Sequence, residues 1–389
     1  MHGYLKMVVT SDLHFGNPKI DPNSMLLKLR KFLYPELRDC HLFIIAGDLY
    51  DQLLTVGSKA HVAASNFISD IFTISDFTGM QVRILHGTYT HDRDQLSVFS
   101  ALATDKTRYK IVNHIECEEI SDLRCGQDVI NTTLKVGYLP DNLSYKHSED
   151  VLGYLQKVMT CLGWGHLDLL IGHGTFAHVI RSDGHRPPCL YEQAQFKDIV
   201  QGPIVMGHIH TPGRNHNVYY CGSFERLAHG EEEKKGFYVF TLDEKRVEGW
   251  RSRFVVNDLA VPFVTILPEG DDIPEIMKNF TSQVDDKLPT GRGYLRVVHK
   301  SPEVRSILHK VCAQQYPHVS YSSKSTGETD ATEIKVDEIT LDLFDDVHPD
   351  VHNLGGLVYQ FLADNNMLGD VTQEQILSHT EEVLKVLRE

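Results

Sequence analysis

Short apolar runs alternate with amphipathic segments over the first 250 residues. Nine runs end in Gly, Asp, His or Asn clusters: 5–10, 42–46, 82–85, 110–115, 133–138, 167–171, 204–206, 218–220 and 237–241. Apolar residues recur with helical spacing between several of them, at 24–33, 59–72 and 150–162. Short apolar runs bounded by turn residues are typical of strands buried in a layered protein. The pattern therefore predicts an α/β fold with buried strands and flanking helices.

The pattern changes near residue 257. Apolar runs at 261–267 and 294–299 predict two strands, and helical spacing at 273–287 and 304–315 predicts two helices. The polar stretch 320–332 reads as a loop, and 351–366 and 372–387 as amphipathic helices. We therefore expect three parts: a first domain over 1–252, a small α/β domain over 253–345 and a helical tail over 346–389.

Composition places the chain among ordinary globular proteins, with 41% hydrophobic and 23% charged residues. No run approaches the roughly 20 apolar residues of a membrane helix, and we expect no secretory leader before the first strand. The seven cysteines are dispersed and form no CxxC pair. Dispersed thiols suit a reducing compartment, so we expect a cytoplasmic protein without a membrane partner.

The net charge of −15 argues against a free-standing nucleic-acid binder, because a basic surface usually drives phosphate binding. Bound divalent metals would offset part of this charge, and a basic partner subunit could supply the missing surface. Histidine is plentiful, at 22 residues, and is a common metal ligand.

Aspartate and histidine follow five predicted strands, mostly beside glycine. The residues are Asp12 and His14, Asp48 and Asp51, His91 and Asp92, His173, and finally His208 and His210. Any one of these pairs is more often a turn or a surface loop, but five at successive strand ends predict a shared metal centre. Carboxylate and imidazole together suit Mn²⁺, Fe²⁺ or Zn²⁺. The adjacent His91 and Asp92 indicate a proton-transfer histidine with a carboxylate that holds its tautomer.

The order DxH, GDxxD, THD, GHG and GHIH resembles that of the calcineurin-like metallophosphoesterase superfamily, over residues 5–241. The segments 220–226, YCGSFER, and 230–237, GEEEKKGF, are similar to the end of the catalytic domain in the SbcD-type nuclease branch. The resemblance implies a two-sheet, sandwich-like core flanked by helices. It also implies a small α/β capping domain and a helical C-terminal tail where members bind an SbcC-like coiled-coil ATPase.

The resemblance also assigns roles to the strand-end residues. One metal would be held by Asp12, His14 and His210, and the other by His173 and His208, with Asp48 bridging the two. His91 would protonate the leaving oxygen, and Asp92 would orient the His91 ring. Asp51 would lie near the substrate. The expected cofactors are two divalent ions, Mn²⁺ first, with Mg²⁺, Fe²⁺ or Zn²⁺ as alternatives.

The third motif departs from the family. Members usually carry Gly-Asn-His-Asp, with the asparagine carbonyl on the second metal, whereas this chain has Tyr89-Thr90-His91-Asp92. Thr90 could offer a hydroxyl, which is a poorer ligand than an amide oxygen. Alternatively, water or His86 takes that place. Either way we expect the second metal to bind more weakly.

The resulting hypothesis is a two-metal nuclease that hydrolyses DNA phosphodiesters with metal-activated hydroxide and no covalent enzyme intermediate. It would be the nuclease subunit of an SbcCD-like complex in DNA end processing, recombination or repair. One alternative is a phosphodiesterase or phosphatase acting on nucleotides or phosphoproteins, since one fold hosts several chemistries. Another is a non-catalytic scaffold for an ATPase partner. The tail either binds that partner or packs on its own domain, and a homodimer is a further open option.

Overall fold

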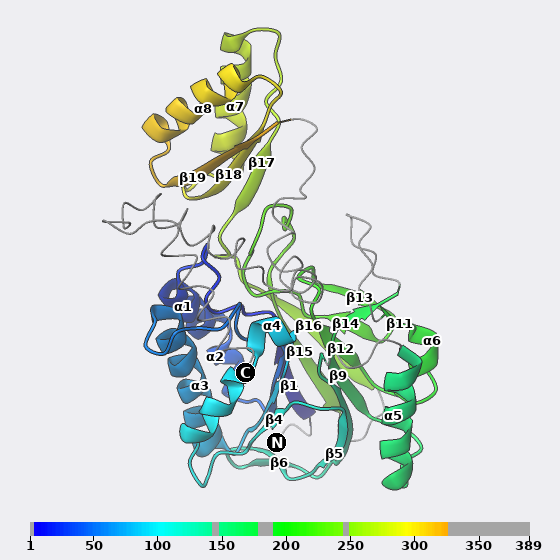
Figure 1. The fold of residues 1–389 in the computed structure, drawn as a ribbon. Coiled ribbons are helices and arrows are strands. Elements are labelled where there is room, and N and C mark those ends of the chain that lie inside the picture. The colour runs from blue at the N-terminus through cyan, green and yellow to red at the C-terminus, as the bar shows by residue number, and fades with distance from the viewer. Residues whose placement is uncertain (1–3, 142–147, 178–189, 244–248, 326–389) are drawn as a thin grey trace, which may run out of the picture. The chain divides into compact units, whose positions relative to one another are not determined.

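The structure is a computed structural model that describes residues 4–141, 148–177, 190–243 and 249–325, all within one unit, Met1–Thr326 (Figure 1). The predicted tail 346–389 and the part of the predicted capping domain from 326 onward lie outside the described residues. None of the described helices is both long and apolar enough to cross a bilayer.

The first of two six-stranded sheets has parallel strands at one side and antiparallel strands at the other. Its order is β16 (Trp250–Val256), β15 (Gly236–Asp243), β1 (Tyr4–Thr10), β2 (Leu42–Ala46), β3 (Gln81–Leu85), β4 (Tyr109–Val112). Strands β1 to β4 run parallel, while β15 and β16 run antiparallel. All residues of β2 and β3 are buried, as expected of central parallel strands.

The second sheet repeats this plan. Its order is β13 (Gly213–Asn215), β14 (Val218–Tyr220), β12 (Ile204–Gly207), β9 (Leu169–His173), β8 (Leu134–Leu139), β5 (Glu116–Ile120). Strands β14, β12, β9 and β8 are parallel, and β13 and β5 are antiparallel edges. The strand predicted at 110–115 ends at Val112 in the structure, where β4 ends, and residues 113–115 connect it to β5 in the other sheet.

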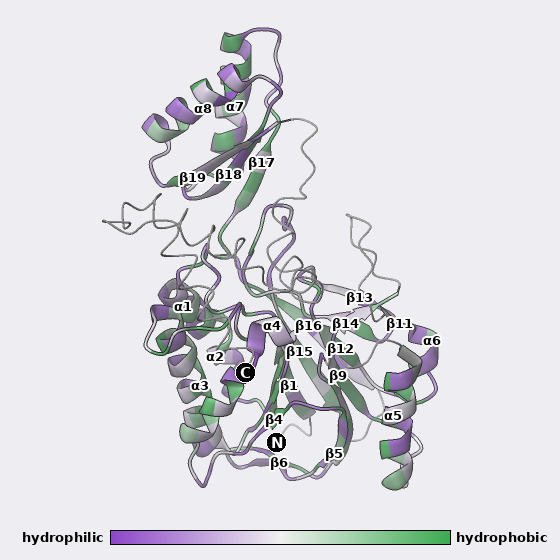
Figure 2. Ribbon diagram, in the orientation of Figure 1, coloured by the Kyte–Doolittle hydropathy of each residue, from purple (hydrophilic) through white to green (hydrophobic). Residues whose placement is uncertain are grey.

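Three stacked apolar cores show that the sheets face each other between two helical layers. Helices α1 (Pro22–Phe32), α2 (Tyr34–Leu37) and α3 (Lys59–Thr78) share one core with the first sheet. Strands of both sheets form the central core. Helices α5 (Ser148–Cys161) and α6 (Gln193–Phe196) share the third core with the second sheet. Figure 2 shows apolar strands inside and helices of mixed polarity outside. The expectation of a mixed α/β protein built on two sheets is confirmed.

Local sequence explains where the main helices begin and end. The Asp21 carboxylate accepts the Ser24 amide at 2.7 Å to cap α1, which starts at Pro22. Ser58 caps α3 in the same way, and Gly79 ends it with φ 78°. Both helices then turn their apolar stripe to the first sheet.

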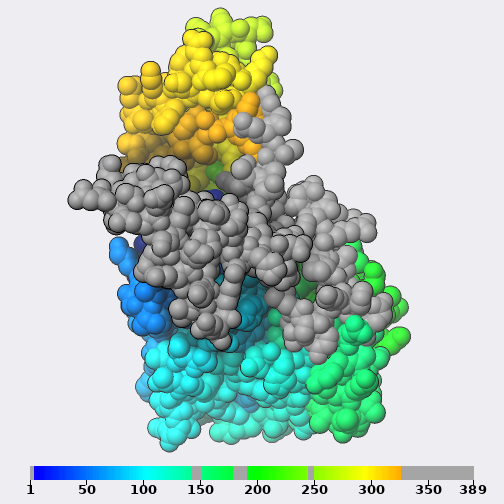
Figure 3. All heavy atoms as spheres, viewed as in Figure 1, coloured from blue at the N-terminus to red at the C-terminus, as the bar shows by residue number. Residues whose placement is uncertain are grey.

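Smaller elements complete the two-sheet core. They are α4 (Tyr89–Asp92), the 3₁₀ helix η1 (Gln95–Ala101), β6 (Leu123–Cys125), β7 (Asp128–Ile130), β10 (Thr175–Phe176) and β11 (Leu190–Tyr191). In the space-filling view, the cyan segment that carries η1 and β4 to β7 lies along the lower edge (Figure 3).

A third sheet carries its own apolar core. Its strands β17 (Phe263–Ile266), β18 (Gly293–Val298) and β19 (Val319–Lys324) are parallel, joined by α7 (Ile273–Lys287) and α8 (Pro302–Gln315). The strands and helices expected between 261 and 315 are therefore present. The loop expected at 320–332 is wrong at its start, because residues 319–324 pair with β18 and Tyr321 packs on this core.

Candidate metal centre

The parallel strands of both sheets end at a common edge, where all five predicted motifs meet. The segments that follow β1 and β2 continue side by side past the strands. The Asp12 amide donates to the Gly47 carbonyl at 3.1 Å, and the His14 amide donates to the Asp48 carbonyl at 3.1 Å. This pairing places residues from two separate motifs next to one another.

Four of the predicted ligands adopt a backbone conformation that side chains usually avoid. Their φ angles are positive: 51° at Asp12, 49° at His14, 51° at Asp48 and 83° at His208. Such conformations cost roughly 1–3 kcal/mol each and cluster at functional sites. The strain re-aims these side chains toward the shared edge, where ordinary strand geometry would alternate them between faces.

Glycines beside the motifs allow the two sheets to approach. A Cβ on Gly47 would lie 2.2 Å from Nδ1 of His173, and a Cβ on Gly207 would lie 2.2 Å from the Ala46 carbonyl oxygen. Both distances are far inside van der Waals contact. The glycines in the GD and GH motifs are therefore required for close approach across the interface between the sheets.

The first cluster consists of Asp12, His14 and His210, whose ligand atoms lie within 4.8 Å of one another. The Nε2 atoms of the two histidines are 3.2 Å apart. Nδ1 of His14 lies 3.2 Å from the Asp51 carboxylate, and Nδ1 of His210 lies 3.0 Å from Glu231. Glu231 is a carboxylate and only accepts, so the ring proton of His210 belongs on Nδ1 and its Nε2 lone pair faces Nε2 of His14. This lone pair, the second imidazole nitrogen and the Asp12 carboxylate together fit a cation.

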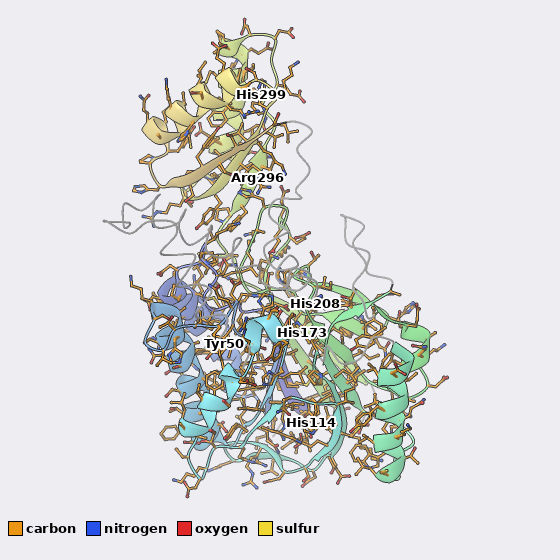
Figure 4. The ribbon with its side chains drawn as sticks, viewed as in Figure 1. Tyr50, His114, His173, His208, Arg296 and His299 are labelled. Atoms are coloured by element: carbon orange, nitrogen blue, oxygen red, sulfur yellow. The ribbon has the colours of Figure 1, made fainter. Side chains whose placement is uncertain are left out.

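The second cluster consists of Asp48, His173 and His208, with ligand atoms again within 4.8 Å. The His173 ring donates from Nδ1 to the Ala46 carbonyl at 2.9 Å and directs Nε2 to the Asp48 carboxylate at 3.1 Å. Figure 4 shows His173 and His208 side by side, with ring centroids 5.3 Å apart. The same Asp48 oxygen lies 3.8 Å from His14 Nε2, so this carboxylate stands between the two clusters.

Electrostatics at the common edge favour positive charge. Burial lowers the pKa of His14 and His210, but neighbouring carboxylates outweigh it and raise the pKa of both imidazoles. Burial likewise opposes ionisation of Asp48, yet the charge of His173 lowers its pKa overall. A buried group of ionised carboxylates that stabilises cationic imidazoles would stabilise a divalent cation in the same way. The residues present therefore fit two metal ions, with the identity of the metal left open.

His91 and Asp51 lie together against the first cluster. His91 donates from Nδ1 to the backbone carbonyl of Asp51, and its ring centroid is 4.9 Å from that of His14. Ligand atoms of His14, Asp51 and His91 also lie within 4.8 Å of one another. Because its Nδ1 is occupied, His91 has Nε2 left for a proton transfer beside the clusters.

Asp92 has contacts other than those expected from the sequence. Its buried carboxylate accepts backbone amides of Asp48 at 3.1 Å, Tyr50 at 3.1 Å and Gly87 at 2.8 Å. Among the described residues it makes no hydrogen bond to the His91 ring, which is held by the Asp51 carbonyl instead. Asp92 therefore fixes the turn that carries Asp48, and the His-Asp adjacency in sequence misled the role assignment because α4 turns the two side chains apart.

The hydroxyl that reaches the second cluster belongs to Thr88, not to Thr90. Thr88 Oγ1 lies 3.3 Å from the Asp48 carboxylate and 3.4 Å from Nε2 of His173, while its amide donates to Asp48 at 2.6 Å. No hydrogen bond of the Thr90 side chain occurs among the described residues. The resemblance implied that Thr90 would be the ligand, but the backbone before α4 places the Thr88 hydroxyl next to Asp48 and His173.

Asp141 is a further acidic group that sequence reasoning missed. Its carboxyl lies near Thr88, Asp48 and His173, and burial raises its pKa. The signal was available, because Asp141 follows β8 two residues after Leu139, in the same strand-end position as the other motifs. An acidic residue after a sixth strand was overlooked because no histidine or glycine accompanies it.

A hollow of about 450 Å³ is lined in part by Gly16, Asn17, Gln52 and Leu53. Asn17 joins it to the site, because its amide donates to the Asp51 carboxylate at 3.1 Å. None of the first-cluster ligands lines this hollow, which borders the site only through Asn17.

No protein-family model and no curated protein matches this chain. Several solved structures are similar to it, two of which follow. GAP50, the anchor in the inner membrane complex of Plasmodium, has a TM-score of 0.39 and 14% identity, over 66% of this chain and 85% of that chain. A cold-active protein-tyrosine phosphatase of a psychrophilic Shewanella has a TM-score of 0.30 and 14% identity, over 64% and 80%.

Proposed function

We propose that this chain is a two-metal phosphoesterase that hydrolyses phosphodiester bonds of DNA, as the nuclease subunit of an SbcCD-like complex. One observation carries the proposal: two carboxylate–imidazole clusters share a sheet edge, with the Asp48 carboxylate between them. Bound divalent cations would neutralise charge on a phosphoryl group and make water more acidic.

The chain's own residues have separable tasks in this reaction. The two clusters would hold the cations to which the phosphate binds, and a phosphate fixed in this way lowers the entropic cost of the attack. His91 would donate a proton from Nε2 to the leaving oxygen, while the Asp51 carbonyl keeps its ring oriented. Asp92 keeps Asp48 in position through backbone amides.

DNA as the substrate is supported by sequence features rather than by the clusters. The segments 220–226 and 230–237 resemble the nuclease branch, and a small α/β unit follows the two-sheet core, as in that branch. The −15 net charge gives the chain little attraction for DNA by itself. We therefore place part of the DNA-binding surface on the proposed ATPase partner.

The decisive experiment compares hydrolysis of single- and double-stranded DNA, a small phosphodiester and a phosphomonoester, with Mn²⁺, Mg²⁺ or EDTA. We expect Mn²⁺-dependent cleavage of DNA that EDTA abolishes and that Asp48→Ala loses. His91→Ala should lower turnover by about 10²-fold or more while metal content stays unchanged. His114→Ala is the matched control, because His114 is an exposed histidine between β4 and β5 (Figure 4).

Different failures point to different corrections. Activity on the monoester alone would replace the nuclease by a phosphatase. Full activity in His91→Ala would remove that residue from the proton transfer. A chain that binds no Mn²⁺ would favour the scaffold alternative. Co-purification with a coiled-coil ATPase, lost when residues 349–389 are deleted, would establish the partner.

A further inference from the structure

A buried ion pair lies directly behind one histidine of the first cluster. Glu231 accepts Nδ1–H of His210 through Oε1 at 3.0 Å. Its Oε2 accepts the Leu227 amide at 3.2 Å and the Lys235 ammonium at 2.6 Å. Lys235 also donates to the backbone carbonyl of His210 at 2.9 Å. The ring and the main chain of His210 are thus held by one connected network.

Such a network has a cost that packing alone does not explain. The Lys235 side chain is 0% exposed and Glu231 is mostly buried. A buried ion pair gains little stability over apolar residues of similar size, because desolvation offsets the attraction. Exposed glutamates stand next to Glu231 at 232 and 233, so the buried acid is distinct from the surrounding charge run.

His173 and His210 differ in the group that accepts the Nδ1 proton of their ring. His173 of the second cluster donates to a neutral carbonyl, that of Ala46. His210 donates to a carboxylate. Such a partner makes an imidazole a stronger metal ligand and fixes the ring proton on Nδ1. Lys235 in turn prevents that carboxylate from rotating toward the ions. This arrangement supports His210, a ligand of the first cluster.

We infer that Glu231 and Lys235 are positioning residues for His210, which set its tautomer and aim Nε2 at the ion of the first cluster. The inference rests on the proposed two-metal function and adds to it the way in which one of the two sites is prepared for its ion. Segment 230–237 then has a physical role: its acid and its lysine support a ligand donated by the preceding GHIH motif.

The test is a Mn²⁺ titration of the full chain, with free Mn²⁺ measured by electron paramagnetic resonance. Wild type should bind two ions. Glu231→Ala should weaken one site by about 10–100-fold and leave the other unchanged. Glu231→Gln retains an acceptor for Nδ1–H, so its binding should be closer to that of wild type. Glu232→Ala removes the same charge from an exposed neighbour and should bind like wild type.

The outcomes separate this inference from the proposed function. If wild type binds no Mn²⁺, the two-metal function fails. If wild type binds two ions and Glu231→Ala binds both with the affinities of wild type, the positioning role is overturned while the proposed function stands. Equal weakening of both sites in Glu231→Gln, with a lowered unfolding midpoint, would also overturn it, because the carboxylate would then be needed for the fold and not for His210.

Discussion

Replacing Arg83 with methionine would break an ion pair that joins the two sheets. Arg83 lies on β3 of the first sheet and is 5% exposed. Its guanidinium donates to the Glu118 carboxylate on β5 at 2.9 and 2.7 Å, and Tyr138 on β8 donates to the same carboxylate at 3.0 Å. Methionine fills most of the arginine's volume, so the substitution removes charge and hydrogen bonds with little cavity.

The structure sets the expected size of this effect. Removing one partner of a buried ion pair costs about 3–5 kcal/mol, because the other charge stays buried without compensation. Glu118 keeps its Tyr138 bond and has Lys110 at 3.8 Å, so we expect about 3 kcal/mol of lost unfolding free energy. Arg30→Met is the matched control. Arg30 also donates through two nitrogens to one carboxylate, that of Asp70, but this pair is exposed. Its loss should lower the free energy of unfolding by less than about 1 kcal/mol.

The loss should depend on pH with a definite sign. Burial raises the pKa of Glu118, but Arg83 outweighs burial and holds the pKa below its ordinary value. A carboxyl whose folded pKa is depressed stabilises the protein above its unfolded pKa, about 4.3, and that stability is lost as pH falls through the folded pKa. The difference in unfolding free energy between wild type and Arg83→Met should therefore be largest near neutral pH and shrink below about pH 4.3.

Urea unfolding followed by circular dichroism, in EDTA and at several pH values, would measure these differences. Adding Glu118→Gln to Arg83→Met should restore part of the stability, since the orphaned charge is then removed. The reasoning is refuted if Arg83→Met costs no more than Arg30→Met, or if its cost grows as the pH falls.

Two further predictions concern the second cluster. Gly87→Ala places a Cβ 2.1 Å from the Asp48 carboxylate, so it should weaken Mn²⁺ binding by at least about 10-fold in a titration; unchanged binding would mean that Asp48 is not held against this glycine. Thr88→Val removes the hydroxyl near Asp48 and should weaken one Mn²⁺ site, while Thr90→Val should leave both sites unchanged. If Thr90→Val instead weakened a site and Thr88→Val did not, Thr90 would be the ligand, as the sequence resemblance implied.

The strand-end motifs show how much of this site local sequence determines. Apolar runs that end in Asp or His beside glycine predicted which side chains converge, because parallel strands present their carboxyl ends at one edge of a sheet. Asp12, His14 and His210 meet there, as do Asp48 and His173. The alternating pattern also predicted the strands of the two-sheet core and the following α/β unit.

Other contacts depend on tertiary structure alone. The choice of Thr88 over Thr90 follows from where α4 begins against Asp48, and the amides that bind Asp92 come from loops after two different strands. The Glu231–His210 contact joins residues 21 apart whose loops meet only when β15 pairs in the first sheet and β12 in the second. Composition and periodicity determine which segments are buried, because burial follows from side-chain polarity. Which oxygen faces which nitrogen is decided only when the sheets pack, because a hydrogen bond requires both atoms within about 3 Å and no local pattern specifies that distance.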